Sequence, residues 1–335
     1  MSILPVNGIR IGSTAAGIRY QGRDDIVVID CQSGTNCAAV FTRNRFSAAP
    51  VQIAKKHLSQ TSPRALLINS GNANAGTGEQ GFLNTIECCR MLADDLGCDV
   101  SEVLPFSTGV IGEQLPVQAF RQALPNCLKN LSADADAWAR ASKTIMTTDT
   151  VAKLFSRKAD IGGTEVTVTG MSKGAGMIRP DMATMLAYIA TDAVIAQPVL
   201  QRLLSEATRV SFNRITVDGD TSTNDACTLL ATGTAKMAAV TENSKEYDQF
   251  STVLTGLMQD LAQAIIRDAE GATKFITINV SGAESEDDCL AVGYTVAESP
   301  LVKTALFASD PNWGRILAAV GRAPATNLDI SEVYR

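Results

Sequence analysis

The sequence predicts an α+β or layered α/β fold. Its apolar residues form strand-length and helix-length blocks that alternate without the even strand-helix rhythm of a doubly wound sheet. The phosphate-binding patterns G-x-G-x-x-G after a strand and G-x-x-x-x-G-K-[ST] are both absent, which disfavours the nucleotide-binding folds. The chain has 335 residues, 45% of them hydrophobic, which is enough for one large domain or two closely packed domains.

Residues 65–70 are an apolar run of strand length, and residues 81–97 predict a helix. The side chains of this helix expected to face inward are Phe82, Ile86, Met91 and Leu92. Residues 165–169 alternate between apolar and polar as a half-buried strand does, and residues 185–189 predict another short strand. A glycine-rich turn lies between these two strands.

Two helices and a last strand are predicted in the second half. Residues 198–212 are amphipathic, and the longest helix is expected to begin near Asn243, which with Glu246 resembles a capping box. A core-facing stripe then recurs every three or four residues: Tyr247, Phe250, Leu254, Leu257, Leu261 and Ile265. Alternating apolar residues predict a strand that contains Ile276, Ile278 and Val280.

Composition and charge argue against several classes of protein. Lys and Arg number 29 against 35 Asp and Glu, so the net charge is −6 and no basic surface for nucleic acid is expected. The start of the chain lacks a signal-peptide pattern, and no apolar run is long enough to span a membrane. The eight cysteines contain no C-x-x-C spacing, and we interpret them as reduced cytosolic thiols in a cytoplasmic protein.

The single histidine restricts the catalytic chemistry. His57 lies in a polar stretch typical of a solvated helix end, so we expect it at the surface. A histidine-based zinc site needs more histidines, and no metal site is predicted. A Ser-His-Asp or Cys-His mechanism would depend on His57 alone, so an acyl-transfer enzyme of this sequence needs another base.

Residues 173–186 are compatible with a threonine nucleophile. Two glycines let the backbone turn tightly, Pro180 stiffens it, and Thr184 follows the small Ala183 at the mouth of an apolar strand. A chain-terminal threonine needs no histidine, because its own α-amine acts as the base once the preceding bond is cut. The alternative is an ordinary loop that enters a strand, in which Thr184 serves strand propensity.

Other polar segments have a functional and a structural interpretation. The Thr108 hydroxyl and the Gly109 N–H form a candidate donor pair for an oxyanion, or belong to a turn after a strand. Loops 69–79 and 218–225 are compatible with Asx and Ser/Thr turns that satisfy their own backbones. The acidic loop 218–225 lacks the twelve-residue spacing and the closing glutamate of a calcium site.

Many segments in the same order resemble the ornithine acetyltransferase family, also called the bifunctional glutamate N-acetyltransferase and amino-acid acetyltransferase. Residues 173–186 resemble the self-cleavage motif of that family. The resemblance extends from residue 8 to about residue 322. The other similar segments are 8–10, 16–19, 38–42, 48–51, 69–79, 108–109, 146–150, 218–225, 270–274 and 310–315.

The resemblance implies two intimately packed lobes with central mixed sheets. It also implies self-cleavage into an α chain of residues 1–183 and a β chain of residues 184–335, assembled as an α2β2 heterotetramer. The implied reaction moves acetyl from N-acetylornithine to glutamate through an acetyl ester of Thr184, in arginine biosynthesis, with ping-pong kinetics. No bound cofactor is implied, and acetyl-CoA stays open as a second acetyl donor.

Site residues follow from the resemblance position by position. Thr108 and Gly109 would form the oxyanion hole, and the bond between Ala183 and Thr184 would be cut. The implied substrate contacts are Thr147, Lys173, Thr184 and Glu270. A lysine and a glutamate complement the carboxylate and ammonium groups of an amino acid, and Lys173 would lower the pKa of the Thr184 amine.

The sequence departs from the family pattern at its end. Family members continue some tens of residues past the region of Gly321 and Arg322, into a segment whose Asn and Thr touch substrate, and residues 327–335 do not match that segment. Two alternatives are therefore kept. One is an N-terminal-nucleophile amidohydrolase or aminopeptidase that uses water as the acceptor, and the other is an inactive truncated paralogue.

Overall fold

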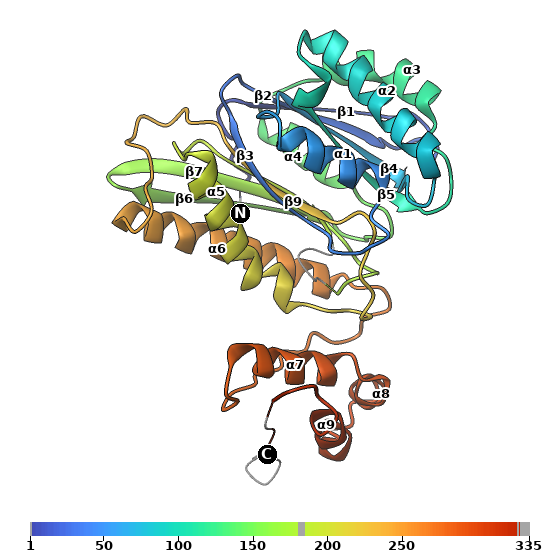
Figure 1. Ribbon diagram of the computed structural model, residues 1–335, viewed down its shortest axis with the longest axis vertical. Coiled ribbons are helices and arrows are strands. Elements are labelled where there is room, and N and C mark those ends of the chain that lie inside the picture. Colours follow the sequence, from blue (N-terminus) through green and yellow to red (C-terminus); the bar gives the residue numbers. More distant parts are fainter. Residues whose placement is uncertain (1, 180–184, 327, 329–335) are drawn as a thin grey trace.

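The protein folds into four layers, in the order helices, sheet, sheet, helices (Figure 1). The computed structural model describes residues 2–179, 185–326 and 328. Within this part of the chain, no helix is both long and apolar enough to cross a membrane. The layered α/β fold with central mixed sheets that the sequence predicts is confirmed.

The first sheet has the strand order β1-β2-β4-β5. These strands are β1 Ile9–Thr14, β2 Ile26–Cys31, β4 Ala65–Asn72 and β5 Val103–Val110. Strand β2 pairs antiparallel with both β1 and β4, whereas β4 and β5 are parallel and bring Gly71 opposite Gly109 at their carboxyl ends. Every residue of β2 and β4 is buried, and the first four residues of each strand form a continuous apolar run.

The second sheet has the strand order β3-β9-β8-β7-β6. These strands are β3 Asn36–Phe41, β6 Lys153–Ile161, β7 Thr164–Lys173, β8 Leu186–Thr191 and β9 Ala226–Ala231. Strand β8 pairs antiparallel with β7 through Leu186 and Lys173, and parallel with β9 through Leu186 and Ala226. Lys173, Leu186 and Ala226 therefore lie at the same level on three adjacent strands.

Helices cover the outer face of each sheet (Figure 1). The helices are α1 Ala49–Leu58, α2 Gly78–Leu96, α3 Val117–Lys129, α4 Ala135–Thr144, α5 Gln197–Arg209 and α6 Lys245–Arg267, with 3-10 turns η1 Val100–Glu102 and η2 Phe212–Arg214. Helices α2 and α3 pack on the first sheet, and α5 and α6 pack on the second. Side chains of both sheets meet between them, where the rings of Phe106 and Tyr188 lie edge to face at 5.3 Å.

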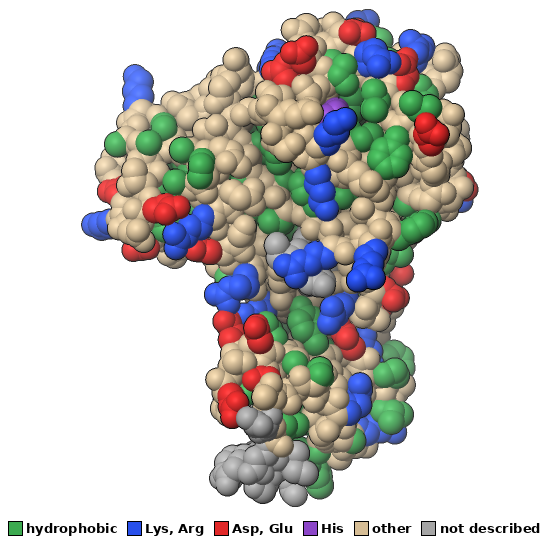
Figure 2. Space-filling view, viewed as in Figure 1, with side chains coloured by type: hydrophobic (Ala, Val, Ile, Leu, Met, Phe, Trp, Pro, Cys, Tyr) green, Lys and Arg blue, Asp and Glu red, His purple; other side chains and the backbone are tan. Residues whose placement is uncertain are grey.

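Three short helices form a smaller unit beneath the second sheet in Figure 1. They are α7 Glu286–Ala297, α8 Pro300–Phe307 and α9 Trp313–Val320. Their shared core is small, with Val296, Val302 and Ala319 at its centre. Hydrophobic side chains reach the surface of this narrower unit in the space-filling view (Figure 2). Phe307 of α8 is 68% exposed.

The predicted elements differ from the structure in three places. Ile276, Ile278 and Val280 do not form the predicted strand, because no strand of the described residues pairs with residues 274–281. Helix α6 is capped by Ser244, whose hydroxyl accepts the Tyr247 N–H, and Asn243 precedes the cap with a positive φ. In α2 the buried side chains include Cys88, Cys89 and Leu92, so Phe82, Ile86 and Met91 are only half-buried.

Candidate active site

A cavity of about 390 Å³ lies where β5, β7 and the loop before β9 meet. It is lined by each described residue that the sequence predicts for the site: Thr108, Gly109, Thr147, Lys173 and Glu270. Ala183 and Thr184 lie outside the described residues. Met185, which follows Thr184 in the sequence, lines the cavity and precedes β8. Segments that lie far apart in the sequence thus contribute to one cavity.

Thr108 and Gly109 are positioned by the parallel pairing of β4 and β5. Both residues lie near the end of β5. They therefore belong to a strand, and not to a turn after a strand, which was the other interpretation of the sequence. Gly109 has a φ of +136°, and a Cβ at this position would lie 2.2 Å from the carbonyl carbon of Gly71. Only glycine fits this close approach of the two strands.

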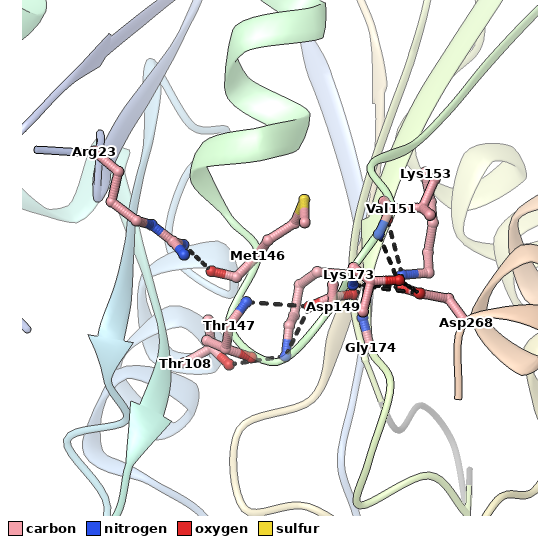
Figure 3. Close-up of polar contacts among 11 residues, drawn as sticks. Arg23, Thr108, Met146, Thr147, Asp149, Val151, Lys153, Lys173, Gly174 and Asp268 are labelled. Carbon is pink, nitrogen blue, oxygen red and sulfur yellow. Dashed lines mark hydrogen bonds and ion pairs between the residues drawn. The ribbon is translucent and has the colours of Figure 1, made fainter. Parts of the chain in front are cut away.

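Lys173 ends β7 and points toward Thr108 and Asp149 (Figure 3). Its Nζ donates to Thr108 Oγ1 at 3.4 Å and lies 4.0 Å from an Asp149 carboxylate oxygen, and 11% of the side chain is exposed. Burial lowers the pKa of Lys173, while Asp149, Asp225 and Glu270 oppose this shift. The nearby carboxylates therefore stabilise the charged form of Lys173, which burial alone would disfavour.

Asp149 connects the two sides of the cavity, a role that the sequence analysis did not assign. Its carboxylate accepts the backbone N–H groups of Thr147 at 3.1 Å and Gly174 at 2.6 Å, and Lys153 Nζ at 2.7 Å. Burial raises the pKa of Asp149, but Lys173, Lys153 and these hydrogen bonds outweigh it and lower that pKa below its ordinary value. The ionised carboxylate fixes the Thr147 loop against the end of β7.

Asp268 extends this connection to the end of α6. Lys153 Nζ donates to Asp268 at 2.6 Å, and the Thr150 and Val151 N–H groups also donate to its carboxylate. Two residues further on, the Glu270 N–H donates to the Ala175 carbonyl at 2.9 Å. Glu270 therefore lies at the cavity because its own N–H contacts Ala175 and the neighbouring Asp268 contacts Thr150 and Val151.

The acidic loop 218–225 holds the segment that precedes the predicted cut. Asp218 accepts the N–H groups of Met177 at 2.6 Å and Ile178 at 3.0 Å. It also accepts the Asp220 N–H, as an Asx turn does. Asn224 reaches across the molecule and donates to the carbonyls of Ala73 and Ser107. This loop thus makes the expected local turn and also connects both sheets at the cavity.

His57 is buried, so the predicted surface position is wrong. Helix α1 packs against β5, and the imidazole Nδ1 lies 2.8 Å from the Val103 carbonyl oxygen. The side chain is 7% exposed, and only a small part of the one histidine reaches the surface in Figure 2. It does not line the cavity.

Cysteines and metal ligands contribute nothing to this cavity in the described part of the chain. All eight cysteines are unpaired, and burial raises the pKa of Cys37 and of Cys88 to about 12. Among the described residues, no group of three or more His, Cys, Asp or Glu side chains is placed to hold a metal ion.

The chain is similar to known proteins in sequence and in structure. The model of the ArgJ family matches residues 10–334. The arginine biosynthesis bifunctional protein ArgJ of Pseudomonas syringae pv. tomato is 54% identical over 98% of this chain and 81% of its own length. The solved structure of the protein of that name from Bacillus halodurans is 31% identical, with a TM-score of 0.51, over 55% of this chain and 95% of that chain.

A second solved structure is that of ornithine acetyltransferase complexed with ornithine, from Mycobacterium tuberculosis. It is 30% identical and covers 54% of this chain and 96% of that chain, with a TM-score of 0.48.

We expect Gly109→Ala to lower the free energy of unfolding by at least about 2 kcal/mol, because the added Cβ meets the Gly71 backbone and the φ is unfavourable. Gly112→Ala is the matched control: its φ is +88°, but nothing lies within 4 Å of the added Cβ, so only backbone strain of about 1 kcal/mol is expected. Urea unfolding of both variants measures the difference. Equal losses would show that β4 does not restrict Gly109.

We expect Asp149→Asn to destabilise the protein by about 3 kcal/mol at pH 7, because Lys153 and Lys173 lose their shared carboxylate. The pKa of Asp149 is lower in the folded than in the unfolded protein, so its stabilisation is present above about pH 4 and is lost as the pH falls further. The difference from wild type should therefore shrink between pH 7 and pH 3 in urea unfolding. Asp95→Asn, at an exposed position, is the control, and a difference independent of pH would contradict the assignment.

Proposed function

This chain belongs to the ArgJ family, and from that premise we propose how its cavity moves an acetyl group from N-acetylornithine to glutamate. The protein is an acyltransferase of arginine biosynthesis that acts on small amino-acid substrates. The observation that carries the proposal is the cavity itself, which brings together Thr108, Gly109, Thr147, Lys173 and Glu270 beside Met185.

In the proposed first event, the chain cuts itself between Ala183 and Thr184. The Thr184 hydroxyl attacks the Ala183 carbonyl carbon, the peptide C–N bond breaks, and water hydrolyses the resulting ester. This gives an α chain of residues 1–183 and a β chain of residues 184–335. The length of the Bacillus halodurans chain supports this division, because that chain aligns with only 55% of this one and does so over 95% of its own length.

The first half-reaction takes acetyl from N-acetylornithine. The free α-amine of Thr184 accepts the hydroxyl proton as the oxygen attacks the acetyl carbonyl, and then gives it to the departing nitrogen of ornithine. The Thr108 hydroxyl and the Gly109 N–H stabilise the oxyanion. Their place at the end of β5, on the cavity wall, supports this role.

The second half-reaction transfers acetyl to glutamate. The glutamate α-amine attacks the acetyl ester of Thr184 and forms N-acetylglutamate, which frees the enzyme for another cycle. Lys173 attracts the carboxylate of each substrate in turn, Glu270 attracts an ammonium group, and Thr147 contacts substrate. One cavity serves two substrates in succession, so ping-pong kinetics are expected.

The proposal also covers the oligomeric state of the protein, its second acetyl donor and its cellular compartment. We propose an α2β2 heterotetramer without a bound cofactor, and the word bifunctional in the names of the relatives supports a test of acetyl-CoA as a second acetyl donor. The eight unpaired cysteines support a reducing compartment, the cytoplasm. Membership of the ArgJ family does not favour the amidohydrolase or inactive alternatives.

We expect Thr184→Ala to remain one chain of 35.4 kDa without transfer activity, and Thr184→Ser to keep part of both activities. The wild-type protein should give chains of about 19 and 16 kDa in denaturing mass spectrometry, since the new amine arises by this cut. Thr252→Ala, on the exposed side of α6, is the control. Normal cleavage of Thr184→Ala would contradict the assignment, and acetate release that needs no glutamate would support the hydrolase instead.

We expect Glu270→Gln to raise the KM for the amino-acid substrates about 10-fold or more, because a charged hydrogen bond to ammonium is replaced by a neutral one. The measurement is the initial rate of transfer from N-acetylornithine to glutamate as each substrate is varied. Glu165→Gln, an exposed glutamate of β7, should leave both KM values unchanged. An unchanged KM in Glu270→Gln would remove this residue from the substrate site.

A further inference from the structure

The two substrates of the proposed reaction differ in the charge at the end of the side chain. N-acetylornithine ends in an ammonium group, whereas glutamate ends in a second carboxylate. The proposed function gives Lys173 a carboxylate of each substrate and Glu270 an ammonium group, so the side-chain carboxylate of glutamate lacks a partner. Recognition of glutamate therefore needs a further cation, and this inference rests on the proposed function.

The lining of the cavity does not supply that cation. Lys173 is the one positively charged side chain among the described residues that line it, whereas Asp225 and Glu270 are acidic. Lys173 also lies 4.0 Å from a carboxylate oxygen of Asp149. A second substrate carboxylate inside the cavity would therefore meet like charges, which costs binding energy. We expect the side-chain carboxylate of glutamate where the cavity opens to solvent.

Arg23 lies at this opening, beside Tyr20. Tyr20 lines the cavity and is 39% exposed, so it stands between the cavity and solvent. The guanidinium carbon of Arg23 lies 4.7 Å from the centre of the Tyr20 ring. Arg23 also donates from Nη2 to the carbonyl of Met146, the residue before Thr147 (Figure 3). Two neighbours thus fix the guanidinium at the edge of the cavity.

A continuous set of contacts joins Arg23 to Lys173 (Figure 3). It runs from the Met146 carbonyl to Thr147, whose N–H donates to Asp149 at 3.1 Å, and Asp149 lies 4.0 Å from Lys173 Nζ. Thr147 itself lines the cavity. The two cations therefore contact the same short segment, on either side of a proposed substrate contact.

The loop between β1 and β2 carries both Tyr20 and Arg23, and Asp25 holds it in place. The Asp25 side chain is buried, and its carboxylate accepts the N–H groups of Ala16 and Ile18, both at 2.6 Å. Burial raises the pKa of Asp25, and these hydrogen bonds and the charge of Arg23 oppose the shift. The loop is therefore fixed by contacts that need no substrate, which limits the entropy lost on binding.

Arg23 forms no ion pair within the described part of the chain. Its hydrogen bond goes to a neutral carbonyl, and its stacking partner is a neutral ring. Two other arginines adjoin cavity-lining residues in the sequence, and both are paired: Arg19 with Glu113 at 3.1 Å and Arg179 with Glu298 at 2.9 Å. A guanidinium has five N–H donors in a planar fork that matches a carboxylate. Arg23 therefore keeps donors for an anion that enters from solvent.

We propose that Arg23 binds the side-chain carboxylate of glutamate while Lys173 binds its α-carboxylate. The guanidinium is already held in place, and its remaining N–H groups donate to the carboxylate oxygens. Glu270 serves the opposite charge at another part of the cavity, where a Cβ at Gly176 would lie 2.6 Å from Glu270 Oε1. The ammonium end of N-acetylornithine turns to Glu270, and the carboxylate end of glutamate turns to Arg23. One cavity thus selects two substrates through two sites of opposite charge.

Steady-state kinetics of purified wild type, Arg23→Gln, Arg23→Lys and Arg19→Gln test the proposal. In ping-pong kinetics the kcat/KM of each substrate reports only its own half-reaction, so donor and acceptor are measured separately. We expect Arg23→Gln to lower kcat/KM for glutamate about 10-fold or more, because a charged hydrogen bond is lost, and to leave kcat/KM for N-acetylornithine unchanged. Arg23→Lys, which keeps the charge without the planar fork, should lie between, and Arg19→Gln should match wild type.

Glutamine as the acceptor separates binding from packing, because it has the shape of glutamate without the charge. Wild type should prefer glutamate to glutamine, and Arg23→Gln should lose this preference. If Arg23 only fixes the Thr147 segment, kcat/KM should fall by the same factor for N-acetylornithine, glutamate and glutamine. That result would overturn the proposal, as would wild-type kinetics of Arg23→Gln. These ratios do not depend on the fraction of folded enzyme. A wild type that transfers no acetyl to glutamate would instead contradict the proposed function.

Discussion

The pairing of β8 between β7 and β9 is the constraint on which the site depends. This pairing brings Lys173 and the Asp225 loop to the two sides of the strand that follows Thr184. In the proposed division of the chain, β3, β6 and β7 belong to the α chain and β8 and β9 to the β chain, so the two strands of the β chain lie between strands of the α chain. The hydrogen bonds of β3 with β9 and of β7 with β8 would hold the two products together, and the cavity would survive the cut.

A buried group of charges supports this arrangement. The side chains of Asp149 and Lys153 are 0% and 1% exposed, and Asp268 is 6% exposed. Burial of each ion costs several kcal/mol, and such groups are tolerated only with close partners and hydrogen bonds to the remaining oxygens. Here the hydrogen bonds go to the backbone on both sides of the cavity, so the charges fix loop positions. The ion pair of Lys153 with Asp268 also joins the two proposed chains.

The sequence predicted the parts of the fold that depend on local pattern. The stripe of α6 follows from periodicity and the strand β4 from its apolar run. Both are confirmed, because every stripe residue of α6 and every residue of β4 is buried. His57 was misjudged, since its polar neighbours do not show that α1 packs on β5. The strand expected at Ile276 failed because a strand needs a partner that periodicity does not report. The clustering of the site residues came from family resemblance, and the role of Asp149 became visible only from its hydrogen bonds with Thr147, Lys153 and Gly174.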